Sequence, residues 1–336
     1  MFSSLIKSML HFGGALAFLR LAVAQSRAVV LRYHSVADTR DRTDLYLDPV
    51  LTVPPHVFEQ QIQFLSRRYT IVPLGDIVRR LRQGRKLDPR ALAITFDDGY
   101  RDNYTRAFPI LCHYKVPATF YLTSGCIDNK QILWTTYLRY IMNATRVKEL
   151  RLTQPERISV DLSAPGAKDD AFKTLVVQMK NISTPRRKEL LAAVAERLDV
   201  HDTSPLNGIM MNWEEVREMQ RHGMSLGAHT VTHPSLPNTS PEEAEREIRG
   251  SKEMIEGHLR ERVLHFSYPN GRGSSHLTEQ VKQLVRKAGF RSAVTSHSGC
   301  IQEGDDLFAL NRVGIYRKHG RLSHLSWEVE ETRWRG

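Results

Sequence analysis

The chain has 336 residues, of which 41% are hydrophobic, so it is long enough to bury the core of one large globular domain. Its three cysteines are too few and too scattered for a disulfide framework, and none forms a Cys-x-x-Cys pair. The net charge of +11 indicates an anionic neighbour such as a phospholipid surface or an acidic polymer. Nucleic acid is disfavoured, because no basic run is interleaved with aromatic residues.

Residues 1–27 form a basic segment without acidic residues, for which two interpretations are open. In the first, Ala22-Val23-Ala24 is a signal-peptidase site and residues 1–24 are a secretory signal. In the second, the segment is a basic amphipathic helix that lies on the core or makes peripheral contact with an anionic membrane. Arg20 interrupts the apolar stretch, and cleavage would fall just before the first expected strand. We therefore favour the uncleaved helix, and a cytoplasmic or membrane-peripheral location over export.

Strands and helices alternate over residues 28–336, which we expect to form one domain. The expected strands cover residues 28–33, 91–96, 117–123, 224–228, 263–268, 291–296 and 309–316, and the expected helices cover 56–69, 74–81, 241–259 and 278–288. The helix from residue 241 has a capping-box spacing, with Pro241 at its first position. Seven or eight strand–helix units in series predict an α/β fold, a barrel of parallel strands.

Residues 129–211 interrupt this alternation. Apolar residues recur there at helical spacing, as at Leu190 and Val194, which predicts a helical insertion on the same face as the site described next. Such an insertion is either a surface subdomain without a role in the reaction or a wall for the substrate. In the second case, Trp134 and Tyr137 offer flat surfaces for sugar rings.

Two pairs of polar residues follow expected strands. Asp97 and Asp98 come directly after the buried strand 91–96, and His229 and His233 follow the strand 224–228. Paired Asp before Gly is common in turns, and 14 histidines produce a His-x-x-x-His spacing by chance. However, the carboxyl ends of strands converge on one face of an α/β fold. One Asp and two His then give three ligands with room for a water, which predicts a catalytic metal site.

Three motifs carry a resemblance to a known family. They are Thr95-Phe96-Asp97-Asp98-Gly99, His229-Thr-x-x-His233 and Tyr268-Pro269-Asn270-Gly271. Together they resemble the first three motifs of the polysaccharide deacetylases, the NodB-homology group also called carbohydrate esterase family 4. The similarity covers about residues 28–126 and 212–315, and it is closest to the circularly permuted type seen in exopolysaccharide deacetylases. It implies a distorted, incomplete (β/α)7-8 barrel.

The resemblance also implies roles for the acidic pair. In the family the first Asp of the motif is the general base and the second is a metal ligand, so Asp97 is the expected base. Asp98, His229 and His233 are the expected ligands. A divalent cation there would activate a water and polarise an acetamide carbonyl. Zn²⁺ suits two nitrogen ligands and one oxygen ligand, and Co²⁺ or Ni²⁺ also fit.

The general acid is less clearly marked. Many family members carry it in a Leu-x-x-His motif near the C-terminus, which has no clear equivalent here. His34, at the end of the first expected strand, resembles the acid of the permuted relatives. With a pKa near neutrality it would protonate the leaving amine. A structural histidine bonded within the barrel mouth is the alternative, and His297 is the second candidate for the acid.

The third motif departs from the family pattern. An Arg that usually braces the base is replaced by Ser267. Arg312, in the last expected strand, either supplies that charge from another direction or is a surface or structural residue. The turn of Tyr268 and Asn270 is expected to offer a backbone N–H, that of Asn270, to the oxyanion.

The sequence thus predicts a metal-dependent hydrolase that removes N-acetyl groups from amino sugars of a polysaccharide or lipid-linked glycan. One alternative is an inactive glycan-binding pseudoenzyme, which a lost ligand or base would indicate; all four residues are present. The other is a deacylase of a non-sugar amide. Aromatic planes in the cleft would favour a sugar, and a deep, narrow apolar pocket would favour a small acyl amide.

Overall fold

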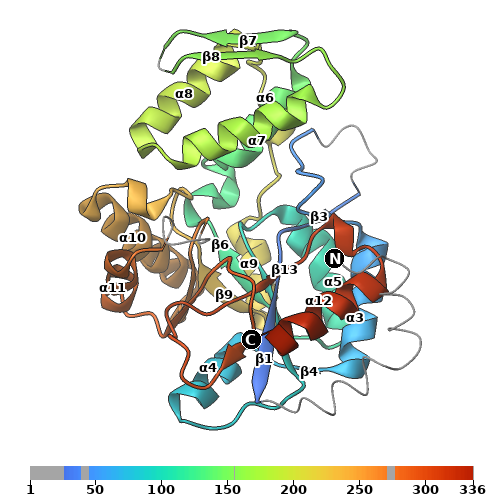
Figure 1. Cartoon of the computed structure of the whole chain (residues 1–336). Helices are drawn as coiled ribbons and strands as arrows, with labels where there is room; N and C mark the ends of the chain where they lie inside the picture. Colours follow the sequence, from blue (N-terminus) through green and yellow to red (C-terminus); the bar gives the residue numbers. More distant parts are fainter. Residues whose placement is uncertain (1–25, 39–44, 155, 271–276, 336) are drawn as a thin grey trace.

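The computed structural model describes residues 26–38, 45–154, 156–270 and 277–335. A nine-stranded sheet curls around the centre of the molecule, with helices on its outer face (Figure 1). The strands are β1 (Arg27–Tyr33), β4 (Thr70–Ile71), β5 (Ala91–Phe96), β6 (Thr119–Leu122), β9 (Ser225–Ala228), β10 (His265–Ser267), β11 (Ser292–Val294), β12 (Ile301–Gln302) and β13 (Val313–Gly314). Parallel strands follow the order β11-β10-β9-β6-β5-β1, and β12 pairs antiparallel with the start of β1. This α/β fold with a curled half-barrel sheet confirms the predicted fold class.

One segment near the C-terminus links two strands at opposite ends of this order. Leu310 bridges to Val294 of β11, and Val313 pairs with Leu31 of β1. The strand expected over 309–316 is therefore reduced to β13, because the segment changes its partner between residues 310 and 313. Arg312 lies in the stretch where the partner changes, and its side chain points into the curled sheet towards Asp97.

Side chains of the parallel strands point alternately to the inside of the sheet and to the outer helices, because a strand has a period of two. In β1, Leu31 packs in the large outer core and Val30 in a small inner cluster. The same alternation turns Arg32 and His34 inwards from β1, and Asp97 inwards from β5. The inside of the sheet is therefore apolar where the strands begin and polar where they end.

The outer helices are α3 (Pro55–Arg68), α5 (Phe108–His113), α9 (Trp213–Arg221), α10 (Pro241–Leu259), α11 (Glu279–Lys287) and α12 (Leu322–Arg335), and α4 (Leu74–Arg82) covers the end at which the strands begin (Figure 1). The bounds of α10 match the prediction, and the Ser240 hydroxyl accepts the N–H of Glu243. Helices α5, α9 and α12 were not predicted, although Asn212 and Glu215 form a capping box at the start of α9.

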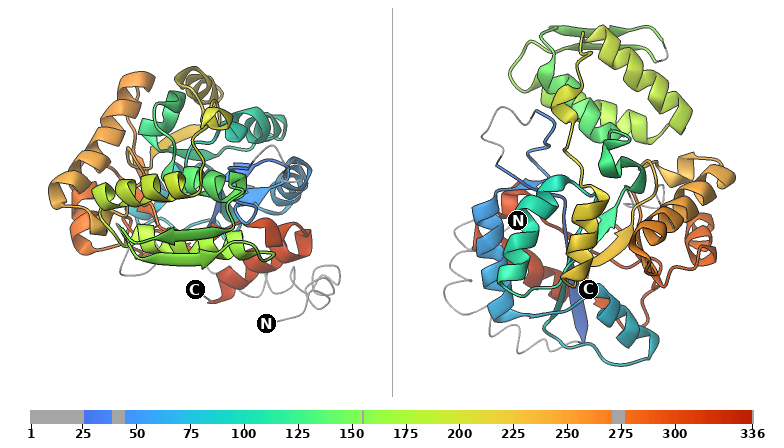
Figure 2. Two further views of the ribbon diagram at one scale, coloured as in Figure 1. Left: turned by 90° about the horizontal axis from the view of Figure 1, so that it is seen from above. Right: turned by 180° about the vertical axis from the view of Figure 1, so that it is seen from behind.

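Between β6 and β9 the chain forms a separate layer over the ends of the strands (Figure 2). It contains α6 (Trp134–Ala144), β7 (Glu149–Leu152), β8 (Ile158–Asp161), α7 (Ala167–Lys180) and α8 (Thr184–Arg197). The sequence predicts helices in this region, and the structure adds the antiparallel hairpin β7–β8. A core of its own, which includes Leu138, Leu175 and Leu190, holds the layer together.

The expectations for the basic segment 1–27 fall almost entirely outside the described residues. Arg27, which the sequence assigns to that segment, is the first residue of β1. Within the described ranges, we find no helix with the length and apolarity that crossing a membrane requires.

Candidate metal centre

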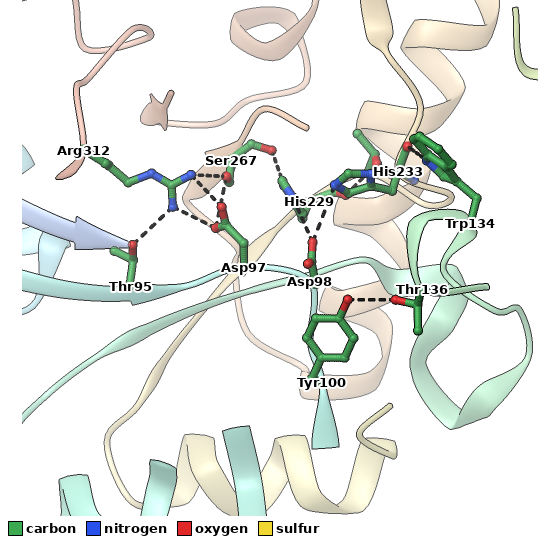
Figure 3. A network of polar contacts seen from close by, with 11 residues as sticks. Thr95, Asp97, Asp98, Tyr100, Trp134, Thr136, His229, His233, Ser267 and Arg312 are labelled. Carbon is green, nitrogen blue, oxygen red and sulfur yellow. Dashed lines mark hydrogen bonds and ion pairs between the residues drawn. The ribbon is translucent and has the colours of Figure 1, made fainter. Parts of the chain in front are cut away.

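Asp98, His229 and His233 come together where β5 and β9 end, on either side of β6 (Figure 3). All three side chains are buried, and the atoms that they offer as ligands lie within 4.8 Å of one another. The Nε2 atoms of both histidines lie 3.5 Å from Asp98 Oδ1. The structure thus brings together the three residues that the sequence predicts as ligands.

The hydrogen bond of His229 occupies its Nδ1 atom and leaves Nε2 as the atom that can bind a metal. His229 Nδ1 lies 2.7 Å from the carbonyl oxygen of Ser267, which only accepts, so Nδ1 carries the proton. Burial lowers the pKa of His233 to about 3, so this imidazole is neutral. Nε2 of His229 faces the carboxylate of Asp98 at 3.5 Å, so both can bind one cation placed between them. Two nitrogens and one oxygen in this arrangement fit a divalent cation such as Zn²⁺.

The backbone is strained at this centre. Asp98, Thr230 and His233 have positive φ angles of 79°, 65° and 58°. Residues other than glycine rarely adopt this region, and each costs about 1–3 kcal/mol unless its surroundings hold it there. Such strain at a cluster of buried ligands is typical of a functional site.

Glu247 of α10 holds the loop that carries both histidines. Its Oε2 atom accepts the N–H groups of Val231 and Thr232 at 2.8 Å each, and its Oε1 atom accepts the Thr232 hydroxyl at 2.7 Å. We did not predict this residue from the sequence. The available signal is an acidic side chain among the buried positions of an amphipathic helix.

Trp134 supports the same loop from the insertion. The side chain is 6% exposed, and its indole N–H donates to the carbonyl oxygen of His233 at 2.9 Å. The guanidinium of Arg187 covers the ring, 5.0 Å from its centroid. A ring covered in this way cannot stack on a sugar, so the expectation that Trp134 is a substrate surface is wrong. Tyr137 packs against the core of the insertion.

Asp97 forms a bidentate ion pair with Arg312. Nη1 and Nη2 of the arginine lie 2.7 Å from the two carboxylate oxygens (Figure 3). The other N–H groups donate to Thr95 Oγ1 at 3.2 Å, to Ser267 Oγ at 2.9 Å and to the carbonyl oxygen of Thr295 at 2.8 Å. Arg312 is fully buried, so the structure places it beside Asp97 and excludes the surface position.

Two opposing effects set the ionisation of Asp97. Burial raises its pKa, and the charge and hydrogen bonds of Arg312 more than reverse this, so the pKa of Asp97 lies well below its usual range. The carboxylate is therefore an anion at neutral and mildly acidic pH. It is held in one orientation, and it is a weak base.

A cavity of about 290 Å³ opens at this centre. The sheet contributes Arg32, His34, Asp97, Asp98, His229 and His233 to its lining, and the insertion contributes Thr135, Thr136, Arg139, Phe172, Val176 and Lys180. The insertion is thus one wall of the cavity. This position favours a role at the substrate over that of a surface subdomain.

His34 lines the cavity, and its Nδ1 atom is buried without a partner among the described residues. Burial lowers the pKa of His34 to about 4, so the expected pKa near neutrality is wrong. His297, the second candidate acid, is not among the lining residues, although its neighbour Ser296 is.

Tyr268 and Asn270 also line the cavity. The Tyr268 hydroxyl donates to the carbonyl oxygen of Phe308 at 3.0 Å and is thereby occupied. Asn270 has a φ angle of 57°, and its side-chain Nδ2 is buried without a partner among the described residues. The side-chain amide of Asn270 is therefore a second donor, beside the backbone N–H that the sequence suggests.

Comparisons with known proteins find deacetylases among the proteins that this chain resembles. The provisionally named polysaccharide deacetylase YxkH of Bacillus subtilis (strain 168) is 22% identical over 287 residues, or 85% of this chain and 70% of that protein. The poly-beta-1,6-N-acetyl-D-glucosamine N-deacetylase of Escherichia coli (strain K12) is 31% identical over 101 residues, or 30% of this chain and 14% of that protein.

A similar solved structure is that of the Streptococcus pyogenes deacetylase PplD in complex with acetate. The TM-score is 0.59 at 19% sequence identity, and the superposition covers 90% of this chain and 98% of that one. This likeness shows a shared fold. The family model described as polysaccharide deacetylase matches residues 84–155 and 178–293, which is more than half of the chain. The chain therefore belongs to the polysaccharide deacetylase family, as its three motifs predict.

Proposed function

We propose that this chain is a metal-dependent hydrolase that removes N-acetyl groups from amino sugars of a polysaccharide or lipid-linked glycan. The observation that carries the proposal is the position of Asp97 beside Asp98, His229 and His233 at one cavity. Membership of the polysaccharide deacetylase family supports the reaction class. The name of the Escherichia coli relative, a poly-beta-1,6-N-acetyl-D-glucosamine N-deacetylase, supports an N-acetylated polysaccharide as the substrate.

In this proposal Asp98, His229 and His233 hold the cation, for which we favour Zn²⁺ over Co²⁺ or Ni²⁺. When bound, the cation supplies the charge that activates water and polarises the acetamide carbonyl. The N–H of His229 to Ser267 keeps the ligand nitrogen of this ring turned towards Asp98. The donors of Asn270 are available to the carbonyl oxygen as it becomes negative.

Asp97 accepts the proton of the attacking water. Because Arg312 makes this carboxylate a weak base, Asp97 also gives the proton up readily. The proton must then reach the leaving nitrogen, and we assign this transfer to His34. Its imidazole is neutral before the reaction, so His34 receives a proton from Asp97 before it donates one. Direct return of the proton by Asp97 is the alternative.

The lining of the cavity bears on the other hypotheses. It carries the charged residues Arg32, Asp48, Arg139 and Lys180, which a pocket for a small apolar acyl amide would not need. A polar, hydrated ligand such as a glycan suits it better. The pseudoenzyme hypothesis gains no support, since the expected base and ligands lie together.

The test is acetate release from N-acetylglucosamine oligomers by the purified chain, together with its bound metal. We expect about one metal per chain and release that stops with a chelator and returns with Zn²⁺. Asp98→Asn is the matched control, because it removes a ligand and leaves Asp97 in place. Acetate release that continues at full rate without bound metal would contradict the proposal.

A further inference from the structure

Two positively charged side chains line the cavity from opposite sides without a carboxylate partner among the described residues. Arg32 comes from the inward face of β1, and Lys180 is the last residue of α7 in the insertion. Helix α7 lies on the side of the insertion that faces the sheet (Figure 1). The two charges therefore face a common space between the barrel and the insertion.

Arg32 is an unusual residue for the inside of a curled sheet. It is 6% exposed, its Nη2 atom donates to the Tyr316 hydroxyl at 2.8 Å, and its Nε atom is buried without a partner in the described part of the chain. The nearby carboxylate of Asp97 is already held at both oxygens by Arg312. Burial lowers the pKa of Arg32, and the charge of Arg312 lowers it further. A buried charge without a counter-ion costs several kcal/mol, so it calls for a function.

Lys180 shares this environment. Its ammonium group makes no ion pair or hydrogen bond with the described residues, and burial, followed by the charge of Arg32, lowers the pKa of Lys180. Arg139 on the same wall differs, because Asp48 and Asp169 compensate its charge. The cations of the lining that lack an ion-pair partner among the described residues are thus Arg32 and Lys180.

Two uncharged polar atoms at the cavity also lack partners in the described part of the chain. His34 Nδ1 and Asn270 Nδ2 are buried at the cavity without partners among the described residues. An acetamide and sugar hydroxyls would occupy these atoms, but they carry no charge to pair with the two cations. The unpartnered groups as a set favour a ligand with a negative charge.

Building on the proposed deacetylation, we propose that the substrate is an N-acetyl amino sugar with an oxyanion of its own, bound between Arg32 and Lys180. The anion is a carboxylate or a phosphate, as in an acidic sugar of a polymer or a sugar phosphate of a lipid-linked glycan. Arg32 and Lys180 thereby select the substrate, while Asp97 and the metal ligands carry out the reaction.

The test compares three probes with the same acetamide. Methyl N-acetylglucosaminide is neutral, N-acetylmuramic acid carries a carboxylate, and N-acetylglucosamine 1-phosphate carries a phosphate. Binding to the Zn²⁺-loaded protein is measured by calorimetry, and acetate release is measured separately. Inorganic phosphate and acetate are titrated alone, because they reveal anions that bind to the metal without the sugar.

We expect one anionic probe to bind and react at least about tenfold better than the neutral probe, and its identity gives the source of the anion. Lys180→Gln should reduce the ratio of anionic-probe to neutral-probe binding about 10- to 100-fold, because one charge-assisted hydrogen bond is lost. Lys173→Gln is the matched control, because Lys173 lies on the same helix, is exposed and pairs with Asp170. It should leave the ratio unchanged.

Arg32→Met separates a binding role from a structural one. Because it removes a buried charge that has no carboxylate partner, we expect an equal or higher melting temperature together with loss of the anionic preference. Equal binding of the three probes, or an unchanged ratio in Lys180→Gln, would overturn the anion site and leave the deacetylase proposal intact. A binding preference without acetate release from any probe would support the anion site and count against deacetylation.

Discussion

The ion pair of Arg312 and Asp97 gives the sharpest test of how this site is built. Arg312→Gln shortens the side chain and removes the charge, so the buried carboxylate of Asp97 loses two hydrogen bonds of 2.7 Å. Among the described residues, the Ser267 hydroxyl, 3.2 Å from Asp97 Oδ1, donates the hydrogen bond that this carboxylate keeps. The carboxylate is 3% exposed and meets solvent only through the cavity, so water replaces only part of what Arg312 supplies.

The cost follows from burial. Removal of one partner from a buried ion pair typically destabilises a protein by about 3–5 kcal/mol, and complete burial of Arg312 places this pair in that class. With Arg312 present, the pKa of Asp97 lies below its unfolded value, so the pair stabilises the fold above about pH 4 and loses this effect as the pH falls further. Without Arg312, burial dominates and raises the pKa of Asp97. The anion then costs stability at higher pH.

The assay is denaturant unfolding of both proteins at pH 5 and pH 7.5, with chelator present so that metal binding does not contribute. In the wild type, Asp97 is ionised at both pH values, so it should not change the free energy of unfolding between them. The variant should become less stable as the pH rises. The difference between the proteins should therefore grow with pH. The pH profile of acetate release by the variant should also show a new loss of activity on its acidic side, near the raised pKa of Asp97.

Arg312→Lys is the matched control, because it keeps the charge and loses the bidentate geometry, so we expect an intermediate loss. Addition of Asp97→Asn to Arg312→Gln should recover part of the stability, since no unpaired anion remains. A difference below about 1 kcal/mol that is independent of pH would refute the reasoning, because a pair worth so little behaves as an exposed one.

Four further predictions concern the reaction and the chain terminus. Asp97→Asn should retain the metal and abolish acetate release; loss of both would mean that the roles of the two aspartates are exchanged. His34→Ala should reduce the rate about 10²–10⁴-fold with metal still bound, and an unchanged rate would assign the proton transfer to Asp97 alone. Glu247→Ala should weaken metal binding about 10–100-fold, as measured by competition with a chelator, whereas Glu245→Ala, an exposed change on the same helix, should not. Residues 1–25 should be required for flotation with anionic vesicles, and equal flotation of a chain that starts at Ser26 would exclude their anchoring role.

The polar centre of this molecule was accessible from the sequence because it depends on rules of short range. A buried apolar strand ends in Asp97, another ends just before His229, and parallel strands place their carboxyl ends on one face. These statements locate the side chains of Asp97, Asp98, His229 and His233 without knowledge of the packing. The bounds of α10 were accessible for the same reason, since a capping pattern is local.

The surroundings of the centre were not accessible, because they depend on how separate parts of the chain pack. Whether Trp134 faces a substrate or the carbonyl of His233 depends on the rotation of α6 against the barrel, which no local pattern encodes. The pKa of His34 depends on burial by the insertion and the barrel mouth together. Arg32 did leave a signal, since a charged residue inside the apolar run Ala28 to Tyr33 is costly unless it serves a purpose.

The exchange of Arg for Ser at position 267 illustrates what a motif records. A motif fixes the position in the chain from which a charge comes, whereas the reaction needs the charge only at a position in space. Ser267 ends β10 and Arg312 precedes β13, yet both donate hydrogen bonds to the carboxylate of Asp97. They can do so because the ends of these strands surround the same inner space. The smaller Ser267 leaves room for the guanidinium, to which its hydroxyl is bonded at 2.9 Å. The positive charge beside Asp97 is therefore kept in space, although the motif has lost it.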